Sequence, residues 1–376
     1  MALVPAAPSP TGMAEAPYRV MVVEDSLVIR GLIARMLESD PRITVVTTVA
    51  NGQQAIGALG RFDVEIVVLD IEMPVMDGLT ALPLLIKADP HLQVIMASTL
   101  TRRNAEVSLR ALAAGAADYV AKPTSSREVS GAVEFRRELL DKVLALGARR
   151  RRRAPRPVSR PQLAAAPRQA GPPASPALRP PPKRVPSAIA IGSSTGGPQA
   201  LIRILGALGV VPQPILITQH MPATFTTILA EHIARAAAMP CAEAVHGEAL
   251  RGGRIYLAPG DWHMTVAARD GAKVIELNQD ARENFCRPAV DPMLRSLARA
   301  CGDGTLAVIL TGMGHDGLAG GRAVADAGGR VIAQDEASSV VWGMPGAVAR
   351  AGLCSEILPL GEMAARLGEI ARGSAG

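Results

Sequence analysis

The chain of 376 residues is long enough for two or three domains, and its hydrophobic content of 48% is typical of globular α/β proteins. Aromatic residues contribute only 2%, so Val, Ile, Leu and Ala must fill the cores. The net charge of +6 arises from residues 148–186, which contain eleven Lys and Arg residues and no acid, so it does not indicate that a globular domain binds nucleic acid.

Residues 1–17 contain several prolines and no basic segment ahead of an apolar run, so we expect a disordered leader and not a signal peptide. No apolar run approaches the length of a membrane span. The four cysteines are dispersed without a C-x-x-C pair, which favours a reducing compartment and disfavours a thiolate metal site. These features predict a cytoplasmic protein with no membrane insertion.

Strand and helix signals alternate between residues 18 and 140. The runs YRVMVVED, ITVVTTVA, VEIVVLD, LQVIMAST and DYVAKP indicate strands, and SLVIRGLIARML has the spacing of an amphipathic helix. This alternation predicts a (βα)5 domain with a parallel sheet and right-handed crossovers. Sheets of this kind bind ligands at the carboxyl ends of their strands.

Three acidic residues are expected at that edge of the sheet. Glu24 and Asp25 end the first strand, and Asp70 ends the third. Clustered carboxylates repel one another unless a cation lies among them, and an oxygen-only ligand set with free positions suits Mg²⁺. The alternative is that these acids only solvate a loop.

Two further side chains follow neighbouring strands. Lys122, just before Pro123, can offer a positive charge to an anion, and Ser98 or the adjacent Thr99 can donate a hydroxyl. A carboxylate, a metal, a hydroxyl and a lysine together describe a phosphorylatable aspartate, which is Asp70 here.

The segments YRVMVVEDS, LDIEMPVMDG and KP resemble the receiver domain of response regulators over about 120 residues. The resemblance implies that Asp70 accepts the phosphoryl group and that Glu24 and Asp25 complete a Mg²⁺ site. It further implies that Ser98 is the switch hydroxyl, Tyr119 the switch aromatic residue and Lys122 a phosphate contact.

Residues 141–186 are rich in Arg and Pro and nearly devoid of large apolar residues. Such a composition cannot bury a core, so we predict a solvated linker. A docking segment for an acidic partner and a nucleic-acid arm are the alternatives, and the lack of aromatic residues for base stacking makes nucleic acid an unlikely partner.

Residues 187–374 predict a second doubly wound, mostly parallel α/β domain, with strands at SAIAIG, PILITQH, RIYLAP, AKVIEL, LAVILT and RVIAQ. Between the first strand and a helix lies GSSTG, a G-x-S-x-G sequence in which the spacing selects Ser194. A serine in this arrangement is presented at a helix N-terminus as a nucleophile. A phosphate-binding turn or a helix cap would use the same residues.

A nucleophilic serine requires a base, and His220 closes the strand PILITQH at the same edge of the sheet. His263, in APGDWHM, is the second candidate for this base. Asp316 follows the strand LAVILT and opens a helix, whose N-terminal end favours the charged carboxylate. The predicted triad runs Ser194, His220, Asp316, an order that differs from that of the α/β-hydrolases.

The stretch containing Asp316 also permits a different interpretation. Gly312-Met313-Gly314-His315-Asp316-Gly317 is a G-x-G-x-x-G sequence between a strand and a helix, with Asp335 or Glu336 about 20 residues further on. This pattern is that of a dinucleotide site. A charged Asp316 in the phosphate loop would repel a pyrophosphate, which disfavours it.

The segments IAIGSSTGGPQAL, ITQHMP, YLAPGDWHM, CRPAVDPM, VILTGMGHDG and IAQDEASSVVWGMP resemble the catalytic domain of chemotaxis protein-glutamate methylesterases, the CheB family, over residues 187–360. The resemblance implies Ser194, His220 and Asp316 as the triad. It further implies that the backbone N–H groups of Thr195 and Met313 form the oxyanion hole. His315 stands where the family often has Asn.

The resemblance implies a phosphorylation-activated enzyme that hydrolyses glutamyl methyl esters on methyl-accepting chemoreceptors and deamidates their glutamines. A histidine kinase of the chemotaxis array would be the phosphodonor. The receiver would need Mg²⁺, and the esterase would need no cofactor. A receiver-regulated hydrolase in a non-motility array and a phosphorylation-controlled binding protein are the alternatives.

Overall fold

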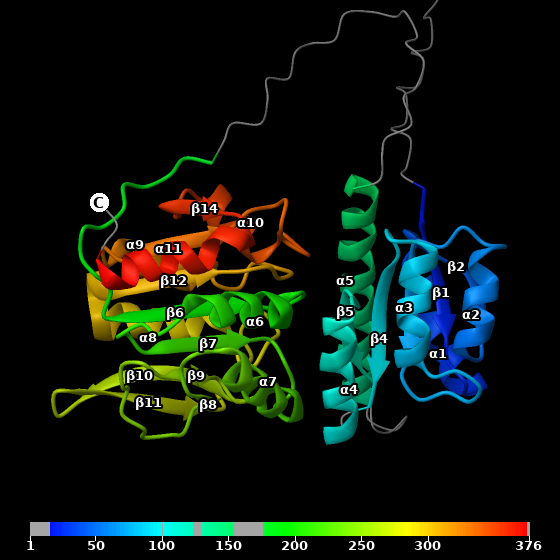
Figure 1. Cartoon of the computed structure of the whole chain (residues 1–376), viewed down its shortest axis with the longest axis horizontal. Helices are drawn as coiled ribbons and strands as arrows, with labels where there is room; N and C mark the ends of the chain where they lie inside the picture. The colour runs from blue at the N-terminus through cyan, green and yellow to red at the C-terminus, as the bar shows by residue number, and fades with distance from the viewer. Residues whose placement is uncertain (1–15, 100, 123–128, 154–175, 374–376) are drawn as a thin grey trace, which may run out of the picture.

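A computed structural model describes residues 16–99, 101–122, 129–153 and 176–373, which form two α/β domains (Figure 1). Most of the predicted leader at 1–17 lies outside the described residues, and so does the linker segment 154–175. The predicted fold class of two α/β domains with parallel sheets is confirmed.

The first domain contains a five-stranded parallel sheet with the order β2-β1-β3-β4-β5. Its strands are β1 (Tyr18–Val23), β2 (Ile43–Val49), β3 (Ile66–Asp70), β4 (Gln93–Ser98) and β5 (Asp118–Ala121). Its helices are α1 (Leu27–Glu38), α2 (Gly52–Leu59), α3 (Gly78–Ala88), α4 (Arg102–Ala113) and α5 (Val129–Arg153).

Local capping explains why the helices of this domain begin immediately after the strand-end loops. The side chains of Ser26, Asn51, Asp77 and Thr101 each accept a hydrogen bond from a backbone N–H of the first helical turn. Because all five strands run in one direction, the loops that hold the predicted acids meet at one edge of the sheet.

The predicted end of the receiver at residue 140 differs from the structure, because α5 continues to Arg153. Val143 and Leu146 lie on the face of α5 that packs against the sheet, and both are fully buried. The arginines at the end of the helix are also partly engaged, since Arg150 Nη1 lies 2.8 Å from Asp89 Oδ2. Composition alone had assigned these residues to the linker.

The second domain contains a seven-stranded sheet with the order β14-β13-β12-β6-β7-β9-β8, in which every pair is parallel. Its strands are β6 (Ala188–Ser193), β7 (Ile215–Gln219), β8 (Cys241–Glu243), β9 (Ile255–Leu257), β12 (Thr305–Ile309), β13 (Arg330–Gln334) and β14 (Glu356–Leu358). A separate antiparallel hairpin comprises β10 (His263–Arg269) and β11 (Ala272–Asn278).

Helices cover both faces of this sheet: α6 (Gly197–Leu208), α7 (Ala223–Ala236), α8 (Val290–Cys301), α9 (Leu318–Asp326), α10 (Met344–Arg350) and α11 (Leu360–Arg372). The three central strands β12, β6 and β7 are neighbours, and α9, α6 and α7 follow them in the chain. The loops at their carboxyl ends therefore lie side by side, and each contains one residue of the predicted triad.

The two domains meet through α4, β5 and α5 of the first and through α6, α7 and nearby loops of the second (Figure 1). The rings of Tyr119 and Phe225 stack with centroids 4.5 Å apart, and both side chains are buried. Arg102 Nη2 lies 2.9 Å from Glu231 Oε1, and Gln199 Nε2 donates to two carbonyl groups at the end of α4.

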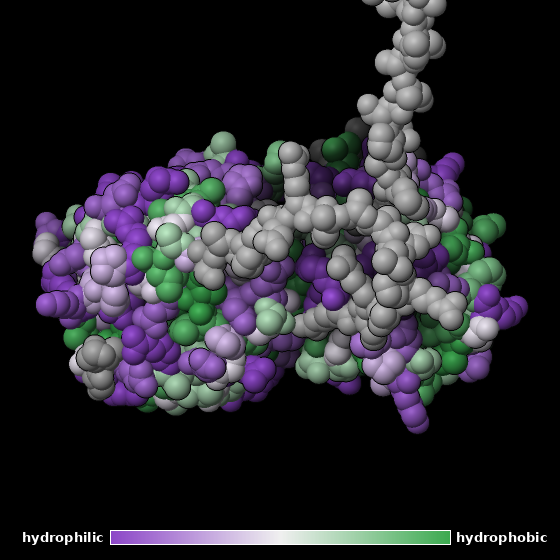
Figure 2. Space-filling view, turned by 90° about the horizontal axis from the view of Figure 1, so that it is seen from above, coloured by the Kyte–Doolittle hydropathy of each residue, from purple (hydrophilic) through white to green (hydrophobic). Residues whose placement is uncertain are grey.

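Hydrophilic side chains are interspersed with hydrophobic ones over the visible face of both domains (Figure 2). Among the described residues, no helix combines the length and the apolar character that a membrane crossing requires.

Replacing Leu146 with Ala should lower the free energy of unfolding of the receiver by about 2–5 kcal/mol, because the fully buried side chain would leave a cavity between α5 and the sheet. Urea unfolding followed by circular dichroism would measure this change. Leu84→Ala is the matched control, since Leu84 is 42% exposed and should cost far less. Equal effects of the two substitutions would contradict the role of the extended α5.

Candidate active site and receiver site

Ser194 lies in the tight turn between β6 and α6. The N-cap residue of α6, Gly196, has a φ of +76°, and a Cβ there would lie 2.4 Å from a methyl group of Val340. Only glycine fits this conformation and this space. The backbone N–H of Ser194 donates to the carbonyl of Thr311 at 3.0 Å, which ties the turn to the loop after β12.

His220 and Asp316 are brought together from the ends of β7 and β12. Nε2 of His220 lies 2.7 Å from Oδ2 of Asp316, and the carboxylate is only 1% exposed. The backbone N–H groups of Val290 and Asp291, at the N-terminus of α8, also donate to this carboxylate at 2.6 and 3.0 Å. Burial alone would raise the pKa of Asp316, but these donors and His220 lower it to about 2.

The second ring nitrogen of His220 faces a residue that the sequence analysis did not select. Sγ of Cys286 lies 3.4 Å from Nδ1 of His220. Burial favours the neutral imidazole, but Cys286 and Asp316 outweigh it, so the pKa of His220 is raised well above its usual value.

Ser194 and His220 are linked through backbone contacts. The N–H of His220 donates to the carbonyl of Ser193 at 3.1 Å, and the side-chain amide of Gln219 donates to the carbonyl groups of both Ser194 and His220. Within the part of the chain that the structure describes, no hydrogen bond joins the Ser194 hydroxyl to His220. The structure thus brings the loops of Ser194 and His220 into contact, with Cys286 facing Nδ1 of His220.

The two predicted oxyanion donors are available for a ligand. Among the described residues, the backbone N–H groups of Thr195 and Met313 donate to no protein acceptor. They belong to the loops after β6 and β12, and Gly312, next to Met313, lies close to Ser194. Such a pair of free amides suits an oxygen that gains negative charge during reaction.

The glycines of residues 312–317 serve close packing and a helix start. A Cβ on Gly312 would lie 2.3 Å from Sδ of Met344 and 2.9 Å from Cβ of Ser194, so glycine is needed where this loop passes the serine. Gly314 and Gly317 have φ values of +80° and +91°, and Gly317 is the N-cap of α9. These conformations favour glycine.

The dinucleotide interpretation of this loop receives no support from the geometry. The N–H of Gly317, which a pyrophosphate would need, donates to the carboxylates of Asp291 and Asp316. Asp335, the acid expected to hold a ribose, accepts from the N–H of Ser338 at 3.1 Å and so closes a local turn.

The remaining histidines have other surroundings. His263 is buried, with Nε2 3.2 Å from the carbonyl of Ala281 and Nδ1 accepting from the N–H of Ala289, so both nitrogens are engaged by the backbone. This second candidate for the base therefore has a structural role here. His315 is exposed, whereas the adjacent Asp316 is buried, so the two side chains point apart.

Two more polar residues around Asp316 were missed by the sequence analysis. Nδ2 of Asn284 donates to Asp316 Oδ1 at 2.9 Å and to Asp291 Oδ2 at 3.0 Å. Asp291, on α8, accepts from the N–H groups of Gly317 and Gly320 at the start of α9. Burial and the neighbouring Asp316 raise the pKa of Asp291 to about 6. No sequence motif marks these residues, since only the fold brings them to the triad.

In the receiver, carboxylate oxygens of Glu24, Asp25 and Asp70 lie within 4.8 Å of one another. Nζ of Lys122 lies 2.6 Å from both Glu24 and Asp70. Burial raises the pKa of both these carboxyl groups, and Lys122 opposes the shift. Three clustered carboxylates with an exposed member, Asp25, are a donor set that fits Mg²⁺.

The two predicted switch residues lie on strands β4 and β5. Ser98 is buried, and its Oγ donates to the carbonyl groups of Thr99 and Asn104. The ring of Tyr119 stacks on Phe225 of the second domain, and burial raises the pKa of Tyr119 well above the usual value.

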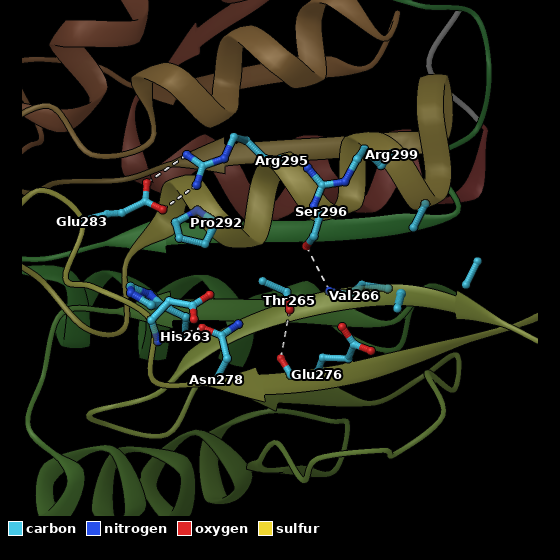
Figure 3. A pocket seen from close by; sticks show the side chains of 14 residues that line it. His263, Thr265, Val266, Glu276, Asn278, Glu283, Pro292, Arg295, Ser296 and Arg299 are labelled. Atoms are coloured by element: carbon cyan, nitrogen blue, oxygen red, sulfur yellow. Dashed lines mark hydrogen bonds and ion pairs between the residues drawn. The ribbon is translucent and has the colours of Figure 1, made fainter.

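A pocket of about 460 Å³ lies between the β10–β11 hairpin and α8 (Figure 3). His263, Glu283, Arg295 and Arg299 are among its lining residues, and Glu283 pairs with Arg295. No residue of the predicted triad lines it, so its shape does not report on the esterase site.

The fold and the comparisons together define a response regulator in which a receiver is joined to a hydrolase domain. Residues 20–134 match the response regulator receiver domain, and residues 189–367 match the CheB methylesterase domain. The chain belongs to the family of protein-glutamate methylesterases/protein-glutamine glutaminases.

Two relatives and one solved structure are similar to this chain. The protein-glutamate methylesterase/protein-glutamine glutaminase of group 2 operon from Rhodospirillum centenum is 60% identical and covers 94% of each chain. The protein-glutamate methylesterase/protein-glutamine glutaminase 1 from Rhodospirillum rubrum is 58% identical over 93% of this chain and 94% of its own. The crystal structure of the Thermotoga maritima CheB methylesterase catalytic domain is 40% identical over 49% of this chain and 98% of its own, with a TM-score of 0.48.

Replacing Asp316 with Asn should lower the pKa of His220, because the carboxylate that stabilises the imidazolium is lost. Titration of the imidazole signals by NMR would measure it. Asp303→Asn is the control, since Asp303 forms an exposed ion pair with Arg184 away from the site. An unchanged His220 pKa in the Asp316 variant would contradict the assignment.

The same substitution should change how stability depends on pH. Because the folded pKa of His220 is raised, the protonated imidazole stabilises the fold fully below the unfolded pKa of about 6.5. This contribution is lost as the pH rises through the folded pKa. The Asp316→Asn variant should therefore show a flatter decline in unfolding free energy over that window.

Proposed function

We propose that this protein is a phosphorylation-activated methylesterase that removes methyl groups from glutamyl esters on the cytoplasmic helices of chemoreceptors, and that it deamidates glutamines there. The main structural observation that supports this proposal is the contact between His220 and Asp316 near the turn that contains Ser194. The names of the relatives at 50–60% identity support the substrate class.

In the proposed reaction, Oγ of Ser194 attacks the ester carbonyl carbon, and its proton passes to Nδ1 of His220. Nδ1 is the acceptor because Nε2 faces Asp316, which holds the ring and stabilises the imidazolium. The imidazolium then protonates the departing methoxide, and methanol leaves. Water attacks the acyl-enzyme by the same route and regenerates Ser194.

The tetrahedral intermediate would be stabilised by the free N–H groups of Thr195 and Met313. Deamidation follows the same steps, with ammonia as the leaving group in place of methanol. The ester and the amide carry the same glutamyl acyl group, so both reactions pass through the same acyl-enzyme and both yield a glutamate carboxylate. The esterase steps use only side chains and amides of the second domain.

In the receiver, we propose that Asp70 accepts a phosphoryl group from a histidine kinase. Glu24, Asp25 and Asp70 would hold Mg²⁺, which neutralises phosphoryl oxygens when bound. Lys122 already contacts Asp70 and is placed to contact a phosphoryl group there. Ser98, at the end of β4, is proposed to be the switch hydroxyl that responds to the phosphoryl group.

We further propose that the resting receiver limits access to the esterase. Three segments near the predicted triad contact it: Phe225, in the first turn of α7, stacks on Tyr119, Phe285 lies under Arg137, and Val341 packs in one apolar cluster with α5. A phosphoryl group on Asp70 would bias this interface toward release by changing the charge beside β4 and β5.

Ser194→Ala should abolish methanol release from methylated receptor membranes while the fold remains intact. Ser193→Ala is the adjacent control, because the Ser193 hydroxyl is buried and donates to Oε1 of Gln219, and this variant should retain turnover. Gas chromatography of released methanol provides the measurement. Substantial turnover by Ser194→Ala would show that another residue is the nucleophile.

A small-molecule phosphodonor with Mg²⁺ should raise methanol release by the wild-type chain and leave Asp70→Asn at its basal rate. Asp63→Asn is the control, since Asp63 lies on the receiver surface away from the acidic cluster. Deleting residues 1–186 should raise the basal rate without a phosphodonor. If the truncated chain is no faster than the full chain, the receiver does not limit access.

A further inference from the structure

The segment of residues 282–287 connects the esterase residues to the receiver. Its two ends are fixed: Glu283 pairs with Arg295 of α8, with 2.9 Å between Oε2 and Nη1 (Figure 3), and Arg287 lies 2.7 Å from Asp261. The N–H groups of Glu283 and Cys286 each donate to the other residue's carbonyl, which closes a tight turn.

Both residues at the tip of this turn have unusual backbone angles. Asn284 and Phe285 have φ values of +51° and +64°, a conformation that non-glycine residues rarely adopt. Consecutive positive φ values in ordinary residues cluster at functional positions, where surrounding contacts hold them in place. This conformation directs the side chains of Asn284, Phe285 and Cys286 to different partners.

Two of the three side chains point inward, to the two members of the dyad. Nδ2 of Asn284 donates to Asp316 at 2.9 Å, and Sγ of Cys286 lies 3.4 Å from Nδ1 of His220. Since Nε2 of His220 is engaged by Asp316, Nδ1 is the remaining site for the proton of Ser194. In this structure, Cys286 occupies that position.

The side chain between them points outward, to the receiver. Phe285 is 68% exposed, and the guanidinium of Arg137 on α5 lies 4.1 Å above its ring. Next to it, Arg282 Nη1 lies 3.2 Å from Glu134 Oε2, also on α5. Three consecutive residues therefore contact Asp316, the receiver and His220 in turn.

We propose that residues 283–287 form a positioning element through which the receiver controls His220, an inference that rests on the proposed esterase function. While Arg137 holds Phe285, Cys286 keeps Nδ1 of His220 away from Ser194. When α5 moves and Phe285 is released, Cys286 withdraws and Nδ1 becomes available to Ser194. Asn284 keeps Asp316 in place in both states.

The titration of His220 in the full-length chain provides a test independent of turnover. The groups that face its ring are Asp316 and Cys286, and Asp291 reaches it only through Asp316. Cys286→Ala should lower the pKa of His220, because the sulfur that raises it is removed. Cys286→Ser keeps the size of the side chain and guards against a loss of folding. NMR signals absent from His220→Gln assign the resonance.

Variants on the receiver side distinguish a specific path from general loosening. Phe285→Ala and Arg137→Ala should both lower the pKa of His220 and raise basal ester hydrolysis several-fold without a phosphodonor. Arg102→Ala is the matched control, since it removes a different contact between the domains, with Glu231, and should leave the pKa of His220 unchanged.

Either of two results would overturn the proposal: an unchanged His220 pKa in Cys286→Ala, or equal shifts in Arg137→Ala and Arg102→Ala. The second result would mean that the domains separate without using the 283–287 turn. Failure of the esterase assignment is detected separately, by methanol release from Ser194→Ala. The imidazole titration would remain interpretable in that case.

Discussion

The catalytic half of the molecule depends on the burial of one charged carboxylate, that of Asp316. A carboxylate with 1% exposure is costly unless hydrogen bonds and a positive charge replace its water. The N-terminus of α8, Asn284 and His220 provide them. The reverse contact is also present. Asp291, in the first turn of α8, accepts hydrogen bonds from N–H groups at the N-terminus of α9, the helix that follows Asp316. The two helices thus fix each other, and His220 is fixed with them.

The order of the sheet makes this arrangement possible. Strands β12, β6 and β7 are adjacent and parallel, so their carboxyl ends present Asp316, Ser194 and His220 from neighbouring loops. The distances between these loops are then set by backbone contacts such as Ser194 N–H to Thr311 O. Gly196 and Gly312 allow these loops to pack closely, because a Cβ at either position would clash with a neighbouring side chain. The placement of Ser194, His220 and Asp316 therefore follows from the order of the strands and from the backbone contacts between the loops that follow them.

Much of this could be predicted from the sequence, because apolar strand runs and residues at strand ends have clear signals. Ser194, His220 and Asp316 each follow such a run, as do Asp70 and Lys122. Short strands such as β8 and β14 were missed, since three residues carry too little periodicity.

Contacts between segments far apart in the chain left no such signal. Cys286 and Asn284 lie in an irregular turn, and their roles arise only where that turn meets the ends of β7 and β12. The predicted boundary of the receiver at residue 140 differs from the end of α5 at Arg153 for a related reason. Composition marks an Arg run as solvated, but Arg150 and its neighbours find acidic partners on the receiver itself, such as Asp89.

The contacts between the two domains are individually weak, as the proposed release of the esterase requires. Its ion pairs are exposed: the side chains of Arg102 and Glu231 are 72% and 44% exposed, and such pairs are each worth about 0–1 kcal/mol. Stacking of Tyr119 on Phe225 adds about 0.5–1.5 kcal/mol beyond the area it buries. A phosphoryl group that favours the released state by a few kcal/mol is sufficient to shift such an equilibrium. Phe225 lies in the first turn of α7, soon after His220, and Phe285 and Val341 lie on loops that contact the residues around Asp316. Under the proposed regulation, these positions would let a weak interface control access to the site.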